Sequence, residues 1–370
     1  MRESYVAPLD SRVVRILLAT PYPHDEVAGV ASFVRTLETE LPARSVSVTV
    51  VAPPRGGAGH VGANVALAIQ SANFLFRNRR SFDAVHGQQL HLQTVALALV
   101  ARVLGIGAVV TVHGRSPVPT GLRGILLRLT EYFAVRFPHK TVFVAESLRA
   151  AFGNRGEVIP VGVPTKELRG IHQERDRIRR ELGVAHAVVV CFVGRVTVDK
   201  GIWTLVESFR IARDHASVPL KLVVVGPLDS VSDEIHHRVR DFAQDTLIVG
   251  PQANPWRYLA SADLFVLPSL HEGLPLSLLE AMAMGVAPIA SGVGDIPRVI
   301  ADGETGWLVR AGDVDSLAAA ILRACGSPDL RAKVGRRAAE SISATYEAAT
   351  MLERYVMLYR QLPGQSGAGG

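Results

Sequence analysis

The sequence predicts an α/β protein built from two doubly wound domains with parallel sheets. Short apolar runs of strand length alternate with longer stretches of helical periodicity, which is the pattern of parallel strands connected by helices. The alternation stops in the charged stretch 166–182 and then starts again. With 370 residues, the chain is long enough for two domains, each with its own core.

The first sheet is expected within residues 1–165. Its first apolar run, residues 13–19, is followed by a loop that contains Pro21 and Pro23 and by an amphipathic helix at about residues 32–41. Further buried strands are expected at residues 47–52, 84–86, 108–112, 142–144 and 158–160.

The second sheet is expected within residues 166–345, after a linker near residues 160–180. Its strands are predicted at residues 187–193, 222–225, 247–249, 264–267 and 287–290. One long final helix is expected from about Leu330 to Arg360, with residues 346–362 forming its last part. The glycine-rich tail, residues 363–370, is predicted to be disordered.

Composition favours a globular cytoplasmic protein. Hydrophobic residues make up 48% of the chain and charged residues 20%, too apolar for a disordered chain. No apolar run reaches the length that crosses a bilayer, and the charged residues Arg2, Glu3 and Asp10 argue against a signal peptide. Two cysteines fit the cytoplasm, and Cys191 lies in an apolar run as a predicted core residue. No His, Cys, Asp or Glu cluster has the spacing of a metal site.

The positive charge is concentrated in the first half. The net charge is +6, and residues 1–165 carry 17 Lys and Arg against 10 Asp and Glu, whereas the rest carries 23 against 24. No helix-turn-helix, zinc or RNP motif accompanies this charge, so we expect no nucleic-acid partner. An anionic membrane surface or a lipid diphosphate fits a one-sided basic domain. The alternative is that the many arginines reflect coding bias alone.

Two glutamates eight positions apart mark the predicted ligand site. Glu272 lies in the loop after the strand ended by Pro268, and Glu280 lies on a helix that begins near Ser277. Ligands of α/β proteins bind at this end of parallel strands. Backbone amides at a helix start bind phosphate, and an ionised Glu accepts hydrogen bonds from paired hydroxyls, so a sugar nucleotide is the predicted ligand. The alternative is an exposed pair on a solvated helix.

The surrounding motifs extend over much of the second half. Residues 262–269, 272–285 and 302–309 together resemble the retaining glycosyltransferases of family 4, whose members have the GT-B fold of two facing Rossmann-like domains. The resemblance implies that Glu280 holds the ribose hydroxyls, that Glu272 contacts the donor sugar, and that the C-terminal helix packs back on the first domain. It also implies a donor loop and a base-binding edge, formed by Gly273, Leu274, Pro275, Leu276, Ser277, Val249 and Gly250.

Two cations follow the first strand of the second domain. Arg195 and Lys200 match the family's G-R-x4-K-G pattern, with Gly201 allowing a tight turn before the next helix. Fixed cations stabilise a leaving diphosphate without a metal ion. The alternative is that they form surface salt bridges, for instance Lys200 with Asp199.

The first half supplies two further candidates by resemblance. His113 ends a strand at the crevice and is implied to lie closest to the reacting sugar, where a neutral imidazole donates or accepts one hydrogen bond with the 6-hydroxyl or orients the acceptor. The alternative is a structural histidine. Gly29 matches the glycine loop beside the diphosphate, although Ala28 stands where a second glycine is common.

Several positions depart from the family pattern. Gln88 stands where a histidine is common, Val161 and Pro164 replace Asn and Asp, and Arg298 replaces an acidic residue. The donor motifs are intact. We therefore expect a different acceptor, not an inactive enzyme.

Two stretches suggest contact with a membrane. Residues 121–140 form an apolar helix with interspersed arginines, and residues 73–80 place three arginines beside two phenylalanines. The alternative is that the helix at residues 121–137 is an ordinary core-packed helix.

The predicted function is hexosyl transfer with retention of configuration, without metal or other cofactor. The donor is a UDP- or GDP-sugar such as GDP-mannose, and the acceptor is a glycan or lipid-linked molecule in polysaccharide or glycolipid synthesis. The enzyme is expected in the cytoplasm, with peripheral contact to the inner face of the plasma membrane. By resemblance, the leaving diphosphate takes the acceptor proton in a front-face displacement. The alternatives are a sugar-nucleotide epimerase or hydrolase, or a non-catalytic sugar-nucleotide-binding subunit.

Overall fold

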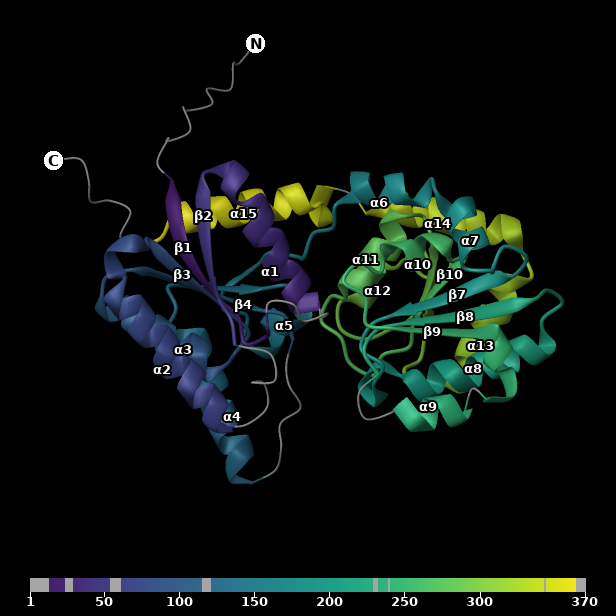
Figure 1. Ribbon diagram of the computed structural model, residues 1–370, viewed down its shortest axis with the longest axis horizontal. Coiled ribbons are helices and arrows are strands. Elements are labelled where there is room, and N and C mark those ends of the chain that lie inside the picture. Colours follow the sequence, from purple (N-terminus) through teal and green to yellow (C-terminus); the bar gives the residue numbers. More distant parts are fainter. Residues whose placement is uncertain are drawn as a thin grey trace, which may run out of the picture.

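The computed structural model describes residues 13–23, 29–53, 61–114, 121–228, 232–238, 240–342 and 344–363. Ala28 and residues 364–370 lie outside these ranges. The described chain forms two six-stranded parallel sheets, with strand orders β2-β1-β3-β4-β5-β6 and β12-β11-β10-β7-β8-β9. Figure 1 shows the two sheets in separate helix-covered units that lie side by side. The predicted fold class is confirmed.

The first sheet carries helices on both faces. Its strands are β1 (Val14–Ala19), β2 (Val46–Val51), β3 (Ala84–Gln88), β4 (Gly107–Val112), β5 (Lys140–Phe143) and β6 (Glu157–Val158). The helices are α1 (Gly29–Glu40), α2 (Val61–Arg77), α3 (Leu92–Val103), α4 (Leu122–Arg136) and α5 (Glu146–Ala151).

Side chains of β1 alternate between two cores. Ile16 and Leu18 share a cluster with Phe33 of α1, whereas Leu17 packs with Leu97 of α3 on the other face. A strand buried on both faces reads as a continuous apolar run, which is why these strands were predictable.

The second sheet repeats this design. Its strands are β7 (Val188–Val193), β8 (Leu220–Val225), β9 (Thr246–Gly250), β10 (Leu264–Leu267), β11 (Ala287–Ser291) and β12 (Trp307–Val309). The helices of this half are α6 (Thr165–His172), α7 (Arg175–Glu181), α8 (Ile202–His215), α9 (Ser232–Arg238), α10 (Trp256–Ser261), α11 (Leu276–Ala283), α12 (Ile296–Val299), α13 (Val314–Cys325) and α14 (Pro328–Ser341). Cys191 is buried and unpaired, as predicted.

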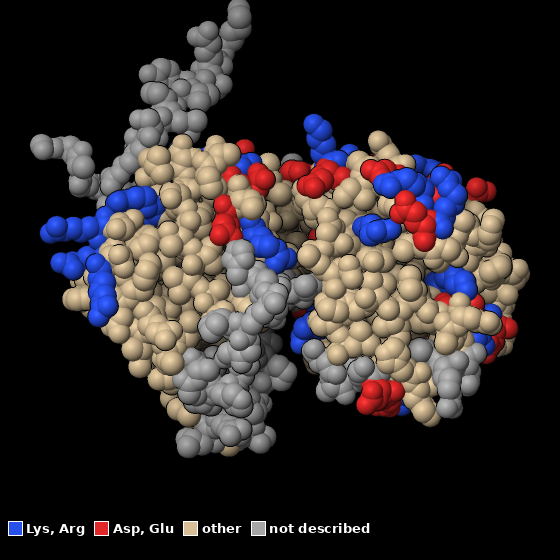
Figure 2. All heavy atoms as spheres, viewed as in Figure 1, with Lys and Arg blue, Asp and Glu red and all other residues tan. Residues whose placement is uncertain are grey.

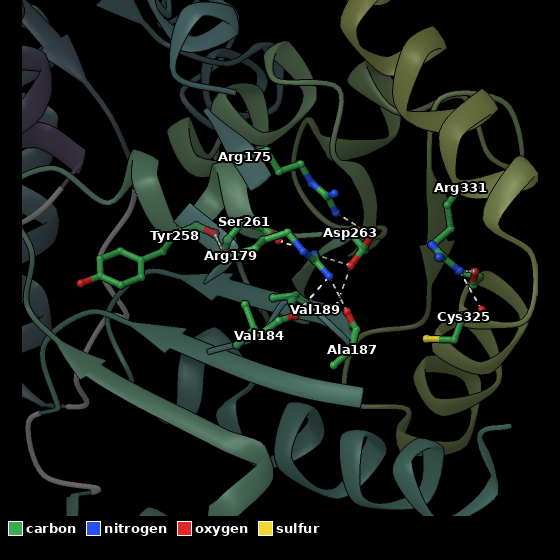
Figure 3. Close-up of polar contacts among 11 residues, drawn as sticks. Arg175, Arg179, Val184, Ala187, Val189, Tyr258, Ser261, Asp263, Cys325 and Arg331 are labelled. Atoms are coloured by element: carbon green, nitrogen blue, oxygen red, sulfur yellow. Dashed lines mark hydrogen bonds and ion pairs between the residues drawn. The ribbon is translucent and has the colours of Figure 1, made fainter. Parts of the chain in front are cut away.

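The charged stretch between the sheets is helical and is fixed to the second sheet. Arg175 and Arg179 of α7 bind the carboxylate of Asp263 at 2.7 and 2.9 Å, and Asp263 also accepts from the backbone N–H of Val189 at 2.8 Å (Figure 3). The Arg179 guanidinium also donates to the carbonyl of Ala187 at 2.5 Å. These contacts tie α7 to the starts of β7 and β10.

The C-terminal segment returns to the first domain. The prediction of one helix from Leu330 to Arg360 is wrong, because the chain breaks into α14 and α15 (Ala348–Arg360). Figure 1 shows α15 running along the first sheet after α14 has packed on the second. Between them, the N–H of Val163 donates to the carbonyl of Tyr346 at 2.8 Å. That pairing fixes the end of a short 3-10 helix, Ala344–Tyr346, which separates α14 from α15.

Candidate active site

Glu272 lies among polar side chains between the ends of β7 and β10. It follows β10, and its side chain is only 7% exposed. Its Oε1 accepts from Lys200 Nζ at 2.7 Å and from the Ser269 hydroxyl at 2.7 Å. Both contacts use the same oxygen, so within the described part of the chain Oε2 retains capacity for a ligand hydroxyl.

The loops after β7 and β10 are locked together behind this pair. Gly201 has φ +73°, and a Cβ there would lie 1.9 Å from the carbonyl oxygen of Pro268. The N–H of Leu270 donates to the carbonyl of Asp199 at 2.9 Å. Only glycine fits this close approach, which brings Lys200 to Glu272.

The two predicted cations differ in their surroundings. Arg195 is 49% exposed and pairs with Asp199 at 3.3 Å, whereas the Lys200 side chain is 21% exposed and pairs with Glu272. The surface ion pair weighed as an alternative therefore exists, but it involves Arg195 and not Lys200. An exposed pair of this kind is weak, so the Arg195 side chain is free to turn toward an anionic ligand.

Glu280 lies on α11, and the Trp256 indole binds its carboxyl group. No pattern in the sequence predicted this contact. Trp256 Nε1 donates to Glu280 Oε1 at 2.9 Å. Burial raises the pKa of the Glu280 carboxyl to about 7, against the Trp256 hydrogen bond, which lowers it. The side chain is therefore poised between its neutral and charged forms near neutral pH.

His113 follows β4 on the opposite side of the crevice. Its Nε2 lies 2.8 Å from Gln88 Oε1, and its ring packs edge-on against Phe33 with centroids 4.6 Å apart. Burial lowers the pKa of His113 to about 3, so the imidazole is neutral at physiological pH.

Several contacts bring the two halves of the site together. Gly273 lies so close to His113 that a Cβ added to this glycine would be 3.0 Å from the His113 carbonyl oxygen. A Cβ added to Gly29 would be 3.9 Å from Cδ1 of Leu276. The predicted first-domain candidates thus border the predicted donor loop. Val249 and Gly250 do not join this group, because they end the edge strand β9, with β8 and β7 between it and β10.

Asp295 is a contact between the domains that sequence reasoning missed. Its buried carboxylate accepts from the N–H groups of Glu146 and Ser147 at 2.6 and 2.8 Å, at the start of α5 in the first domain. Its own N–H donates to the carbonyl of Gly273 at 3.0 Å. One residue therefore links the donor loop to the first domain.

A cavity of about 370 Å³ adjoins this contact. It is lined from both domains, from the segment before α15 and from α15 itself, by Glu146, Leu274, Asp295, Arg298, Tyr346 and Arg354 among others. The unusual Arg298 therefore faces the domain junction.

No group of three His, Cys, Asp or Glu side chains in the described ranges is arranged to hold a metal ion. Of the four predicted charged groups, the described contacts bring together only the Lys200 ammonium and the Glu272 carboxylate.

Two helix-covered parallel-sheet domains side by side are the arrangement of the GT-B fold class. The family model described as Glycosyltransferase Family 4 matches residues 27–167, and the model described as Glycosyl transferases group 1 matches residues 187–327. The chain belongs to the glycosyltransferases of family 4, and so to the enzymes of polysaccharide or glycoconjugate biosynthesis.

Curated relatives match over most of the chain. The α-maltose-1-phosphate synthase of Mycolicibacterium smegmatis is 29% identical over 94% of this chain and 98% of its own. The N-acetyl-α-D-glucosaminyl L-malate synthase of Bacillus anthracis is 26% identical over 79% of this chain and 78% of its own.

Solved structures agree in fold. Sucrose-phosphate synthase from Thermosynechococcus elongatus has a TM-score of 0.80 at 20% identity and covers 94% of this chain and 98% of its own. Anabaena HepE, in complex with UDP, has a TM-score of 0.74 at 18% identity and covers 93% of this chain and 99% of its own. At these identities the likeness concerns the fold alone.

Proposed function

We propose that the chain is a retaining hexosyltransferase that moves a hexose from a UDP- or GDP-sugar to a glycan or lipid-linked acceptor. The observation that carries this proposal is the Lys200–Glu272 pair at 2.7 Å, in the loops that follow β7 and β10. Glu280 lies on α11, the helix after the same loop, and His113 lies next to Gly273. The structural neighbour HepE has been solved with UDP and with UDP-glucose, which supports a uridine nucleotide among the candidates.

Each polar group has a role in this proposal. Glu280 binds the ribose hydroxyls, and the free oxygen of Glu272 binds a hydroxyl of the hexose. Lys200 and Arg195 neutralise the diphosphate as the glycosidic bond breaks, so the transfer requires no metal ion. The leaving diphosphate takes the acceptor proton on the same face of the sugar, which retains the configuration.

The ion pair at Glu272 explains how Lys200 is held ready for the donor. A lysine side chain has several rotatable bonds, and fixing it costs conformational entropy. Its bond to a carboxylate that is itself fixed by Ser269 places the ammonium before the diphosphate arrives. Such preorganised charge is the main source of electrostatic catalysis.

The surface of the first domain suits a membrane-bound acceptor. Side chains on α2 and α4 expose large apolar groups, with Ile69, Phe76 and Ile125 each more than half exposed. Exposed arginines accompany them at positions 77, 79, 80, 128 and 136. The Arg136 guanidinium lies 4.2 Å from the ring centre of Tyr132, an arrangement that keeps charge beside an exposed aromatic ring.

We infer from this combination that the first domain rests on anionic lipid. Apolar side chains enter the interface while arginines contact the headgroups. Figure 2 shows Lys and Arg projecting from the end of the first domain that lies farthest from the second. No helix in the described ranges is long and apolar enough to cross a membrane.

A donor panel tests the proposal. UDP-glucose, UDP-galactose, GDP-mannose and the free nucleotides are screened by thermal shift, and the stabilising donors are then incubated with and without lipid or glycan extract. Transfer that needs extract supports the proposal. Hydrolysis or epimerisation without extract indicates the related enzyme classes, and binding without turnover indicates a non-catalytic subunit.

A further inference from the structure

A chain of buried hydrogen bonds crosses the first domain from the C-terminal helix to His113. Tyr359 OH of α15 lies 2.7 Å from His86 Nδ1, and Gln88 Nε2 lies 3.1 Å from His86 Nε2. Gln88 Oε1 lies 2.8 Å from His113 Nε2. The chain has a branch in which Thr111 Oγ1 contacts His86 Nε2 at 2.8 Å and Tyr355 OH at 2.9 Å.

Burying such a chain of polar groups costs free energy unless each group has a hydrogen-bond partner. Tyr359, His86 and Gln88 are all fully buried in the core of the domain. Apolar side chains would fill the same volume without this requirement. The chain also ends at the crevice and begins on a helix that arrives from the second domain, so packing alone does not explain its course.

The Gln88 amide determines which groups in this chain of hydrogen bonds donate and which accept. Its Nε2 is a donor only, so His86 Nε2 must accept, and His86 Nδ1 must carry the proton that it donates to Tyr359 OH. Its Oε1 is an acceptor only, so His113 Nε2 must carry a proton. In a neutral imidazole the other nitrogen, Nδ1, is then an acceptor.

We propose that Gln88 is the positioning residue of the site: with His86 and Tyr359 it fixes His113 as the Nε2–H tautomer, so that His113 meets a substrate hydroxyl only as a hydrogen-bond acceptor. The two options left open by the sequence, donation or acceptance, are thereby reduced to one. The role toward substrate rests on the proposed hexosyl transfer, whereas the tautomer is a property of the protein alone.

Burial supports this assignment. It lowers the pKa of His86 and of His113 to about 3 each, so both rings are neutral and have a defined tautomer at neutral pH. The T-shaped contact with Phe33 holds the His113 ring plane as well.

The test is ¹⁵N NMR of the full chain labelled at histidine, at pH 7.5. Long-range ¹H–¹⁵N correlations distinguish protonated from unprotonated ring nitrogens, and the His86→Asn and His113→Asn spectra assign the two rings. We expect His86 protonated on Nδ1 and His113 protonated on Nε2. The opposite tautomer at His113, or a mixture of both, in the wild-type protein overturns the proposal.

Two substitutions at Gln88 separate positioning from packing. Gln88→Leu keeps the bulk and removes both hydrogen bonds, so His113 should become a mixture of tautomers. Gln88→Glu keeps the acceptor toward His113 but loses the donor toward His86, so only His86 should change its tautomer. Gln93→Leu is the matched control, because Gln93 is also buried in this domain. Its amide donates to the Ser71 hydroxyl at 2.9 Å and takes no part in the hydrogen bonds between Tyr359 and His113. An unchanged His113 spectrum in folded Gln88→Leu overturns the proposal, and so does an unchanged His86 spectrum in folded Gln88→Glu.

Ligand titration tests the role toward substrate. The sugar nucleotide that binds among UDP-glucose, UDP-galactose and GDP-mannose should shift His113 Nδ1, and its free nucleotide should not. In turnover, Gln88→Leu should lower kcat about tenfold with KM for the donor nearly unchanged, as expected for one lost hydrogen bond. A bound donor that leaves Nδ1 unshifted overturns the acceptor role. If no sugar nucleotide binds at all, the proposed function is wrong. The tautomer of His113 is still decided by the spectra of the free protein.

Discussion

The Lys200 ammonium and the Glu272 carboxylate, 72 residues apart in sequence, meet at 2.7 Å across the ends of β7 and β10. The contact joins the two motifs that each contribute charge to the crevice. It also means that each group depends on the other, because removal of the ammonium leaves a nearly buried carboxylate without its counterion.

The two glutamates should separate nucleotide binding from sugar binding. Glu280→Ala should weaken the binding of both free nucleotide and intact donor to a similar extent. Glu272→Ala should weaken intact donor more than free nucleotide, because the hexose contact is lost in addition to the partner of Lys200. A hydrogen bond from a desolvated hydroxyl to a charged group is worth about 1.5 to 3 kcal/mol, or roughly tenfold or more in affinity. Isothermal titration calorimetry with nucleotide and donor checks both. Negligible effects of both substitutions would exclude the assigned positions.

The two cations should affect turnover alike and stability differently. Lys200→Ala and Arg195→Ala should each lower kcat by a few orders of magnitude, since every ~1.4 kcal/mol of lost leaving-group stabilisation costs tenfold. Only Lys200→Ala should also lower the Tm, because Arg195 pairs with an exposed partner. Arg210→Ala on α8, where Arg210 is 48% exposed and pairs with Glu207 at 3.1 Å, is the control for removing a surface arginine.

Chelation tests the metal-independent mechanism separately. EDTA should leave wild-type turnover nearly unchanged, because the side chains neutralise the diphosphate. An absolute requirement for a divalent cation, restored by magnesium or manganese, contradicts that role.

Glu280 should make both stability and donor binding depend on pH. Its folded-state pKa is raised, so the folded protein loses stability from this residue as pH rises from about 4.5 through about 7. Glu280→Gln removes the titration and keeps an acceptor for Trp256, so its Tm relative to wild type should increase between pH 4.5 and 8. Wild-type affinity for the donor should improve over the same interval as the carboxylate ionises. A Tm difference that stays constant with pH argues against a raised pKa.

Asp295 should help to hold the two domains together. Asp295→Ala removes two hydrogen bonds to the start of α5, and we expect a larger radius of gyration by X-ray scattering and a higher KM for the donor. Asp313→Ala is matched to it, because Asp313 caps α13 at 2.9 Å within the second domain. Both substitutions should cost about 1 kcal/mol of stability. Identical scattering and KM for the two variants would show that Asp295 is only a local cap.

The arginines of the first domain should act together on anionic lipid. Serine at positions 77, 79, 80, 123 and 128 should abolish sedimentation with anionic vesicles at low salt and leave donor affinity intact. Five exposed arginines of the second domain provide a charge-matched control when replaced by serine: Arg210, Arg257, Arg323, Arg336 and Arg337. If wild-type protein ignores such vesicles at low salt, a soluble acceptor is favoured.

Most of the fold was predictable because its strands are buried on both faces. Every residue of β4 and β7 is buried; β7 is a continuous apolar run and β4 contains Thr111 as its one polar side chain, so length and composition predicted both strands. β12 was missed because three residues carry too little periodicity. The break before α15 was missed because residues 342–347 contain neither Gly nor Pro, and it is set by pairing with Val163.

The site was predictable where a motif is contiguous and not where a contact is distant. Glu272, Glu280 and Lys200 were singled out from local patterns. Asp295 contacts a backbone N–H 149 residues earlier, and that N–H has no sequence signature. From the sequence, Gln88 was seen only as a departure from the family pattern. Its role depends on hydrogen bonds of its amide to His86 and His113, which only the structure shows.

A crystal structure with the intact donor selected by the panel tests the proposed donor site most directly. We expect the ribose hydroxyls at Glu280, the diphosphate at Lys200 and Arg195, and the hexose between Glu272 and His113. A donor bound elsewhere, or one bound in the crevice with its hexose directed away from Glu272, would contradict the proposal.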